Sequence, residues 1–408
     1  MSRSLLALLV LTALASCKTY EQSGGLRWNA GFEEDAYRLP MDAFVVRLPN
    51  DSALLVVKFF GTERNRNTKW KDSIRFTFKV FIDTTGGTVF NYRDSTSVVL
   101  PALAFNTEQD AATVARFKAP SNMRWLMVQA ESGDPAMRYK RNVEIQSQNN
   151  FAPLVTDSAG VPINPLHLHA GESYRVHALQ NVLTLQHFAY PPRPAPPVYR
   201  VNDPVPERTL SDTTLVVDFS NTVRFTEPGM YRVRDSVRDA SFVLCVHDGF
   251  YPEVKTPNEL IAPLRYITRN EEYNKMYEAS DPKAAIDSFW MSRARSEAVA
   301  RRSIRIYYNR VEEANRLFSC HQPGWMTDRG MALIIYGTPD RAFKFKEGEI
   351  WSYSTNFVRP VEFVFVRKEG FAGVDYELRR MPEYLQSWNQ QSFKWRTGGI
   401  LNDVPQLY

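Results

Sequence analysis

The residue pattern of the chain changes near Tyr251, and this change limits the folds that the chain can adopt. Before it, short runs of β-branched and aromatic residues alternate with turn sequences such as "TTGG" and "SGDP". After it, apolar residues return at helical spacing through "SDPKAAIDSFWMSRARSEAVARRSIRIYYNRVEEANRLFS". Strand patterns repeat every two residues and helix patterns about every 3.6. The sequence therefore predicts a multidomain chain in which β modules precede an α+β domain.

The first β region covers residues 43–148. Its strand-like runs are "AFVVRL", "ALLVVKFFG", "IRFTFKVFI", "TSVVLPAL", "ATVARFKA" and "RWLMVQAE". Short strands at regular spacing, without helical stretches between them, are typical of two packed antiparallel sheets. We therefore expect an antiparallel β-sandwich in this region.

A second β region covers residues 149–250. Its strand-like runs are "GESYRVHAL", "TLVVDFS", "GMYRVRD" and "ASFVLCVHD". The stretch "FTEPGMYRV" is similar to the turn followed by a tyrosine that opens one strand of immunoglobulin-like modules. The pattern predicts a second, immunoglobulin-like β-sandwich.

Seven prolines lie between Pro191 and Pro206, inside this second region. Proline has no backbone N–H and a fixed φ, so the segment cannot form a central strand or a helix. We expect an extended loop. A stiff surface loop is the favoured interpretation, and a docking segment for a partner's groove is the alternative.

Residues 251–408 are expected to form an α+β domain. Asp281 is a suitable N-cap, with Pro282 at the first helical position, and one helix is expected to continue to about Phe318. Four strand-like runs follow it, "MALIIYG", "EIWSYS", "VEFVFVRK" and "VDYELRR", which favour an antiparallel sheet with the helix on one face. The region holds five of the eight tryptophans, a load more typical of a core than of a ligand platform.

The N-terminus has the features of a secretory signal: Arg3, an apolar run, and small residues before Cys17. Its end, "LASC", resembles the lipobox of bacterial lipoproteins, in which the cysteine is acylated. The resemblance implies a signal peptide over residues 1–16, lipidation of Cys17 and a tether over residues 17–42. Because no Asp follows the cysteine directly, the sorting rules of such lipoproteins imply the outer membrane. Glu21 is the only acid close to the cysteine, which favours the periplasmic face over the cell surface.

Three stretches of the C-terminal region carry a family resemblance. They are "YYNRVEEANRLFS", "GWMTDRGMALIIYGTPD" and "EIWSYS". Together they resemble the GWxTD domain, named for residues that are Gly324, Trp325, Thr327 and Asp328 here, from about Tyr251 to the C-terminus. The resemblance implies a secreted or lipid-anchored envelope protein of the Bacteroidota type, with β domains before the motif domain. It implies no catalytic activity.

The motif residues are assigned structural or interaction roles. Gly324 is expected to ease the exit from the helix, Trp325 to anchor the turn in the core, and Thr327 or Asp328 to accept backbone N–H bonds. Arg329 is expected to pair with an acid. The full set is Gly324, Trp325, Thr327, Asp328, Arg329, Gly330, Tyr336, Gly337, Pro339 and Asp340.

Catalytic interpretations of these residues are disfavoured. Asp328 and Asp340 are separated by an expected strand of ~20 Å, too far for a pair of catalytic carboxylates. Cys320 and His321 are adjacent at a helix end, where neighbouring side chains diverge, so they are not expected to form a thiol nucleophile with its base. The sequence thus predicts no enzyme and no cofactor.

Metal and disulfide sites are likewise not expected. His167 and His169 in "LHLHAGE" offer a partial ligand pair, with Glu172 near, but lack a third ligand set. Cys245 and Cys320 are interpreted as two buried thiols, with one disulfide as the alternative.

The resulting hypothesis is a non-enzymatic outer-membrane lipoprotein, an accessory or scaffold subunit of an envelope complex for outer-membrane protein assembly or secretion. Its expected partners are the membrane, through Cys17, and other envelope proteins. The alternative is a glycan- or peptide-binding protein or hydrolase with a cleft around Trp325, Asp328, Arg329 and Asp340. The formal net charge of +5 gives no footprint for nucleic acid.

Overall fold

The computed structural model describes residues 41–48, 52–59, 74–83, 90–100, 111–118, 123–133, 136–144, 153–177, 181–191, 193–201, 203, 211–235, 240–345, 347–354, 359–370 and 373–402. The chain divides into two compact units, Met1–Ser147 with Asp340–Ser352, and Gln148–Pro339 with Tyr353–Tyr408. The signal peptide expected over residues 1–16, the expected lipidation site Cys17 and most of the tether expected over residues 17–42 lie outside the described residues. No helix in the described ranges has the length and hydropathy needed to cross a bilayer.

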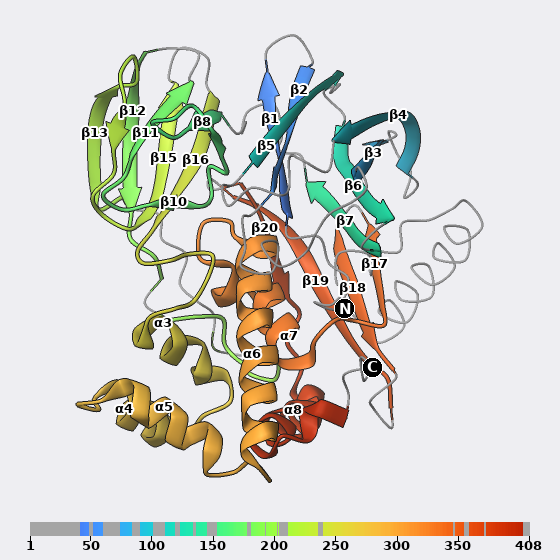
Figure 1. Cartoon of the computed structure of the whole chain (residues 1–408), viewed down its shortest axis with the longest axis vertical. Helices are drawn as coiled ribbons and strands as arrows, with labels where there is room; N and C mark the ends of the chain where they lie inside the picture. The colour runs from blue at the N-terminus through green and yellow to red at the C-terminus, as the bar shows by residue number, and fades with distance from the viewer. Residues whose placement is uncertain are drawn as a thin grey trace. The chain divides into compact units, whose positions relative to one another are not determined.

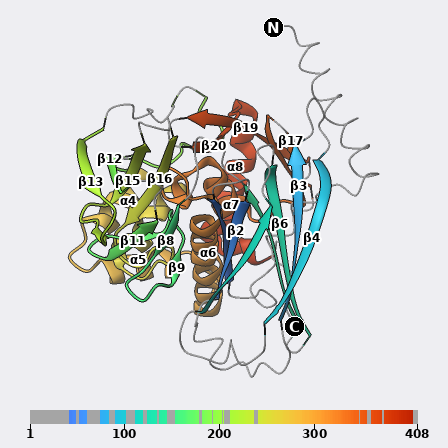
Figure 2. The same ribbon diagram turned by 90° about the horizontal axis from the view of Figure 1, so that it is seen from above.

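The first unit contains two antiparallel sheets with strand orders β1-β2-β5 and β4-β3-β6-β7. Their strands are β1 Met41–Leu48, β2 Ser52–Phe59, β3 Ile74–Asp83, β4 Phe90–Leu100, β5 Ala111–Lys118, β6 Met123–Gly133 and β7 Ala136–Glu144. Figure 2 shows β3 lying between β4 and β6. Burial does not alternate strictly in β1 and β2: the neighbours Ala43 and Phe44 are both buried, as are Leu55 and Val56, so both faces of these strands are covered in part.

The second unit begins with two further sheets, ordered β10-β16-β15-β12-β13 and β14-β11-β8-β9. Their strands are β8 Leu154–Thr156, β9 Pro162–Ile163, β10 Leu168–His169, β11 Ser173–His177, β12 Val182–Phe188, β13 Thr213–Asp218, β14 Val223–Arg224, β15 Gly229–Asp235 and β16 Ala240–His247. Both sheets contribute to one core that includes Val155, Val176, Val233 and Leu244. Pairing is antiparallel except between β10 and β16, which are parallel. The protein is therefore a multi-sheet α+β protein.

The helices of the second unit are α3 Pro257–Ile261, α4 Asn270–Tyr277, α5 Pro282–Met291, α6 Glu297–Phe318, α7 Asp328–Tyr336 and α8 Leu385–Thr397. Four 3₁₀ segments accompany them: η3 Ala262–Tyr266, η4 Gly324–Met326, η5 Pro382–Tyr384 and η6 Gly399–Asn402. In Figure 1, α7 lies beside α6. Glu272 of α4 accepts two hydrogen bonds from Arg396 of α8, at 2.7 and 2.8 Å.

The expected single helix from Asp281 to Phe318 is wrong: it is two helices, α5 and α6. Asp281 caps α5 as predicted, accepting from the Ala284 N–H at 3.0 Å. The chain leaves helical geometry after α5, and Ser296, in an extended conformation, caps α6. An N-cap serine binds the free N–H groups of a new helix, so it starts a second helix inside an otherwise helical pattern.

The run "MALIIYG" was expected to be a strand, and this is also wrong: it is most of helix α7. Every residue of α7 is buried, so the helix has no polar face. A short apolar run without a polar face cannot be distinguished from a buried strand by periodicity. The segment that follows, β17 Arg341–Phe345, supplies the strand in its place and pairs with β18 Gly348–Tyr353.

The other three expected strands are confirmed in β18, β19 Val361–Gly370 and β20 Gly373–Leu378, and β19 pairs antiparallel with β20. The tryptophans are confirmed as core residues at four of five positions: Trp290, Trp351, Trp388 and Trp395 are buried.

The expected surface loop is only partly confirmed: Arg200 and Val201 are exposed, but the middle of the described proline-rich segment is buried. Pro194, Ala195, Pro196 and Val198 are buried. The Ala195 N–H donates to the Met326 carbonyl at 2.8 Å, and the Val198 carbonyl accepts from Met381 N–H at 3.3 Å. An extended proline segment has unpaired carbonyls, and here they pair with the C-terminal part of the same unit.

Two glycines let η4 and α7 approach their neighbours closely. A Cβ on Gly324 would lie 2.0 Å from the Ala314 carbonyl oxygen of α6. One on Gly330 would lie 1.9 Å from the carbonyl oxygen of Gly324. Real Cβ atoms do not reach such distances, so the backbone packing of α6, η4 and α7 depends on the missing side chains.

We expect Gly324→Ala to destabilise the second unit, because the new methyl group meets the backbone of α6 rather than a movable side chain. Overpacking of this kind costs about 1–3 kcal/mol or more. For a unit of this size, each kcal/mol lowers the melting temperature by roughly 2–4 °C. Thermal unfolding followed by tryptophan fluorescence measures the shift.

The matched control is Gly399→Ala, where the nearest atom to a new Cβ is 3.5 Å away, an ordinary contact. Its melting temperature should stay close to that of the wild type. Equal melting temperatures for Gly324→Ala and the wild type would show that the close approach does not constrain the fold.

Candidate functional site

The motif residues form the corner between α6 and α7. Thr327 is the N-cap of α7: its hydroxyl accepts from the Gly330 N–H at 3.0 Å and donates to the Gly324 carbonyl at 2.8 Å. The Thr327 hydroxyl thereby provides a hydrogen-bond partner for one backbone N–H and one backbone carbonyl at the turn, as an N-cap threonine does. The role predicted for Thr327 is confirmed.

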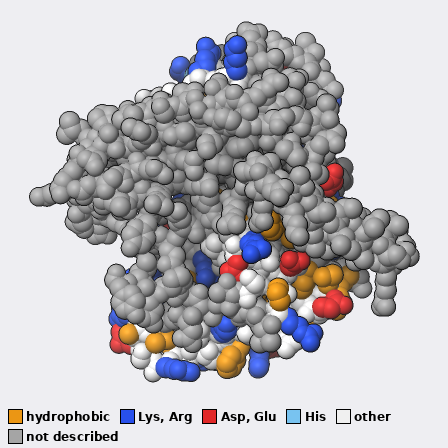
Figure 3. Space-filling view, turned by 90° about the vertical axis from the view of Figure 1, so that its right-hand side faces the viewer, with side chains coloured by type: hydrophobic (Ala, Val, Ile, Leu, Met, Phe, Trp, Pro, Cys, Tyr) orange, Lys and Arg blue, Asp and Glu red, His pale blue; other side chains and the backbone are white. Residues whose placement is uncertain are grey.

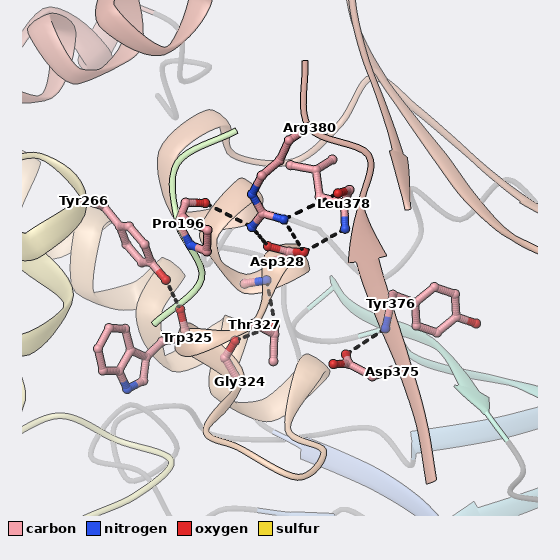
Figure 4. A network of polar contacts seen from close by, with 11 residues as sticks. Pro196, Tyr266, Gly324, Trp325, Thr327, Asp328, Asp375, Tyr376, Leu378 and Arg380 are labelled. Atoms are coloured by element: carbon pink, nitrogen blue, oxygen red, sulfur yellow. Dashed lines mark hydrogen bonds and ion pairs between the residues drawn. The ribbon is translucent and has the colours of Figure 1, made fainter. Parts of the chain in front are cut away.

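Asp328 has a longer-range role than the local cap predicted for it. Its two carboxylate oxygens accept hydrogen bonds from the guanidinium of Arg380, and Oδ2 also accepts from the Leu378 N–H at 2.7 Å. The same guanidinium donates to the Pro196 carbonyl at 3.1 Å. Figure 4 shows Arg380 between Asp328 and Pro196. One buried ion pair thus joins α7, the end of β20 and the proline-rich segment.

The electrostatics of this pair are those of a buried group. Burial raises the pKa of Asp328 to about 6, while the Arg380 charge and the Leu378 N–H limit the rise. Both carboxylate oxygens are bound by Arg380 or the Leu378 N–H, which partly offsets the cost of burying the charge.

Arg329 lies over two aromatic rings. Its guanidinium carbon is 3.9 Å from the centre of the Tyr376 ring and 4.9 Å from that of Phe318. Such cation–π contacts stabilise a buried arginine. From the sequence we expected Arg329 to pair with an acid. The contact with Tyr376 was not predicted, because this residue lies far from Arg329 along the chain.

Trp325 is half-buried, so the prediction that it anchors the turn in the core is wrong for its side chain. Its ring meets Tyr266 edge to face, with centres 6.1 Å apart. Its backbone is held instead: the N–H donates to Asn315 Oδ1 at 3.0 Å, and the carbonyl accepts from the Tyr266 hydroxyl at 2.9 Å. Figure 4 shows the Tyr266 contact.

The far end of the motif closes helix α7. Tyr336 is buried and its hydroxyl lies 3.1 Å from Ser387 Oγ. Gly337 has φ of +80°, a conformation that suits glycine at a helix C-terminus. Pro339 is buried and Asp340 is half-buried. The segment between Asp328 and Asp340 is thus mainly a helix of nine residues, ~13 Å long, and not the expected strand.

Sequence reasoning missed the residues that join the β16 strand to this corner. The Tyr251 hydroxyl accepts from the Gly324 N–H at 3.1 Å and contacts Ser319 Oγ. Its ring stacks on His247, with centres 3.6 Å apart. Burial lowers the pKa of His247 to about 3, so this imidazole is neutral. A lone tyrosine and histidine in a strand-like stretch gave no signal of this role.

Cys320 and His321 were expected to diverge, and this is wrong. Cys320 Sγ lies 3.5 Å from His321 Nδ1, because both residues follow the end of α6, where helical geometry no longer separates them. Cys245 and Cys320 are buried and not bonded to each other, as interpreted from the sequence.

His167 and His169 do not belong to the one three-residue group with metal-ligand spacing in the described part of the chain. His167 packs edge to face on Tyr251, with ring centres 5.6 Å apart. In the lower part of the face drawn in Figure 3, Lys and Arg side chains lie among acidic and hydrophobic ones. This mixture agrees with the mild net charge.

We expect Arg380→Met to destabilise the second unit strongly, because it leaves the Asp328 carboxylate buried without its counter-charge. Removing one partner of a buried ion pair costs about 3–5 kcal/mol. The control is Arg379→Met, at the neighbouring exposed position. Urea unfolding measures both free energies.

The cost should depend on pH. The Asp328 pKa of about 6 lies above the ordinary value of 3.8, so the free energy of unfolding falls as the pH rises through this interval. Without Arg380 the pKa rises further, and the loss extends to higher pH. The deficit of Arg380→Met should therefore be larger at about pH 8 than at about pH 5. A deficit that does not change with pH would contradict the assignment.

The corner between α6 and α7 lies within a region that matches a known protein domain. Residues 229–397 match the GWxTD domain. The match begins inside the second β region, earlier than the expected start at Tyr251, because it includes strands β15 and β16. No curated protein matches the chain. Among solved structures, the chain is similar at 11% identity and a TM-score of 0.18 to Escherichia coli alpha-2-macroglobulin activated by porcine elastase, over 52% of this chain and 22% of that chain. That overlap is too low to indicate a common fold. The C-terminal part of the chain, residues 229–397, is thus a GWxTD domain.

Proposed function

We propose that this protein is a non-enzymatic, lipid-anchored scaffold subunit of an envelope complex at the outer membrane, active in outer-membrane protein assembly or secretion. The anchor is Cys17 and the favoured location is the periplasmic face, both from the N-terminal sequence. The observation that carries the proposal is the use of the motif charges: Asp328 binds Arg380 and Leu378 inside the fold. Because this charged motif residue binds groups within the domain, we assign the contacts with partners to other surfaces of the protein.

Strand β13 is the surface that we assign to a partner. Among the described strands it pairs with β12 alone, at the edge of its sheet. Leu215 is 53% exposed and Val216, on the opposite face, is 74% exposed. Edges of stable monomers are usually protected by lysine, proline or a bulge, and "TTLVVD" has no lysine or proline. An unprotected apolar edge suits an extended segment of another protein that adds to the sheet.

The immunoglobulin-like nature of the β modules is part of the same proposal. The Tyr231 hydroxyl donates to the Glu227 carbonyl four residues upstream, at 2.7 Å. A tyrosine that binds back to the preceding turn in this way is typical of immunoglobulin-like domains. Such modules commonly serve as spacers and binding platforms in envelope and surface proteins.

The alternative, a glycan- or peptide-binding cleft or hydrolase at the motif, has less support. Arg329 lies between two rings and Asp328 is bound to Arg380, so neither is presented to a substrate. Trp325 keeps a half-exposed ring, but a single ring without the two charges lacks the polar groups that orient a sugar.

We expect Cys17→Ser to move the protein from the membrane fraction to the soluble periplasmic fraction, because acyl chains at this cysteine are the proposed anchor. Fractionation followed by immunoblotting measures the distribution. Ser16→Ala, which keeps the cysteine, is the control. A Cys17→Ser protein that remains in washed membranes would contradict the anchor.

We expect the tagged full-length protein, solubilised in mild detergent, to recover at least one envelope protein in a fixed ratio. Val216→Lys should reduce that recovery about tenfold or more, because a lysine on the edge opposes strand addition. The control is Phe393→Lys, which places the same charge at a residue that is 66% exposed on α8.

Two results would overturn this proposal. A wild-type protein recovered as a solitary monomer would exclude the scaffold role. Equal recovery by Val216→Lys and the wild type would exclude β13 as the binding edge.

A further inference from the structure

Three potential metal ligands meet beside the motif corner. Cys320 and His321 follow the end of α6, and Asp375 lies in β20. Cys320 Sγ is 3.5 Å from His321 Nδ1, and the same nitrogen is 3.8 Å from Asp375 Oδ2. All three ligand atoms lie within 4.8 Å of one another. Thiolate, imidazole and carboxylate are the three side-chain groups that zinc binds in proteins.

The surrounding backbone holds these groups in place. The Cys320 N–H donates to the Gln322 carbonyl at 3.2 Å, and the Cys320 carbonyl accepts from the Cys245 thiol at 2.7 Å. Asp375 Oδ1 accepts from the Tyr376 N–H at 2.7 Å, which leaves Oδ2 as the oxygen on the His321 side. Figure 4 shows this contact of Asp375. Ligands oriented by such hydrogen bonds lose little freedom when an ion binds.

Two of the three separations between ligand atoms are close to those around a tetrahedral ion, and the third, between Cys320 Sγ and Asp375 Oδ2, is within 4.8 Å. Zinc bonds of about 2.3 Å to sulfur and about 2.0–2.2 Å to nitrogen and oxygen place neighbouring ligand atoms ~3.4–3.6 Å apart. The separation of Sγ and Nδ1, 3.5 Å, already fits. The separation of Nδ1 and Oδ2, 3.8 Å, needs a shift of only a few tenths of an ångström.

The same cluster is not arranged as a catalytic triad. In a triad, the base contacts the nucleophile through one ring nitrogen and the acid through the other. Here both the thiol and the carboxylate face Nδ1. Burial, together with the Asp375 charge, raises the pKa of the Cys320 thiol well above its usual range, which opposes formation of a free thiolate nucleophile.

We propose that Cys320, His321 and Asp375 bind one zinc ion through Sγ, Nδ1 and Oδ2, with water as the fourth ligand. The side chains of His321 and Asp375 are 34% and 29% exposed, which gives the ion and its water a path from solvent. The soft thiolate and the imidazole select zinc over magnesium and calcium, which prefer oxygen ligands. On binding, the S–H bond of Cys320 breaks, its proton leaves to solvent, and the sulfur electron pair forms the bond to zinc.

The ion would link the exit of α6 to β20 and so stabilise the second unit. The Arg329 guanidinium lies over the Tyr376 ring, and its positive charge opposes that of a bound cation. The proposal is independent of the scaffold role, since it needs no partner protein.

The test uses the full-length protein in detergent, stripped with a chelator and then dialysed against zinc. Mass spectrometry of the metal content should give one zinc per chain. Cobalt in place of zinc should give a thiolate-to-cobalt charge-transfer band and the strong visible bands of tetrahedral cobalt. Titration calorimetry gives the affinity, and thermal unfolding should show a higher melting temperature with zinc.

The variants are Cys320→Ser, His321→Ala and Asp375→Asn. Loss of a contact that merely orients a ligand already weakens metal affinity about 10–100-fold, so loss of a ligand should weaken it by ~100-fold or more. Cys245→Ser is the matched control, because its hydroxyl can still donate to the Cys320 carbonyl. It should bind zinc as the wild type does.

Circular dichroism separates loss of binding from loss of folding, and His321→Ala, at a partly exposed position, is the variant least able to disturb the core. Absence of bound zinc in the folded wild type would overturn the proposal. So would full affinity in folded His321→Ala, or a cobalt spectrum without a thiolate band.

Discussion

The buried pair of Asp328 and Arg380 is the interaction on which the second unit depends. Taking two charges out of water costs free energy that their attraction only partly returns, so such a pair adds little net stability. The pair instead fixes which parts of the chain lie next to one another. Asp328 opens α7, Arg380 follows β20, and the guanidinium also binds the Pro196 carbonyl, so three distant parts of the chain must meet for all of these polar groups to be satisfied. An arrangement that misplaced one part would leave a buried charge alone, and that penalty excludes it.

The other motif residues make this meeting possible. Thr327 starts α7 at the right residue, and the glycines at 324 and 330 bring its backbone against η4 and α6. Tyr251 then fixes the same corner from the β side through its hydroxyl. The second β region and the helical region are therefore one packed unit. This explains in physical terms why the family match begins at residue 229, within the strands, and not at the change of composition near Tyr251.

Local chemistry was readable from the sequence, and contacts between distant residues were not. The Asp281 cap, strands β18, β19 and β20 and the threonine cap depend on a few neighbouring residues, and each was predicted. Helix α7 was mistaken for a strand because all of its faces are buried, which removes the polar stripe that reveals a helix. The partners of Asp328 lie 50 and 52 residues downstream, and the proline-rich segment lies more than 120 residues upstream. No local pattern encodes such pairings. Cys320 and His321 were misjudged because helical geometry was applied to residues just past the helix end.

The ion pair and the proposed zinc site act on the same two elements of the fold. Asp375, Leu378 and Arg380 all belong to β20 or the residue pair that follows it, while Cys320, His321 and Asp328 all belong to the connection from α6 into α7. The ion pair holds the inner side of this joint, where both side chains are largely shielded from water. The three ligand atoms hold its partly exposed side, where binding depends on the concentration of the ion. Zinc bound at these three ligands, as proposed, would add to the contacts between β20 and the motif corner and so stabilise the second unit.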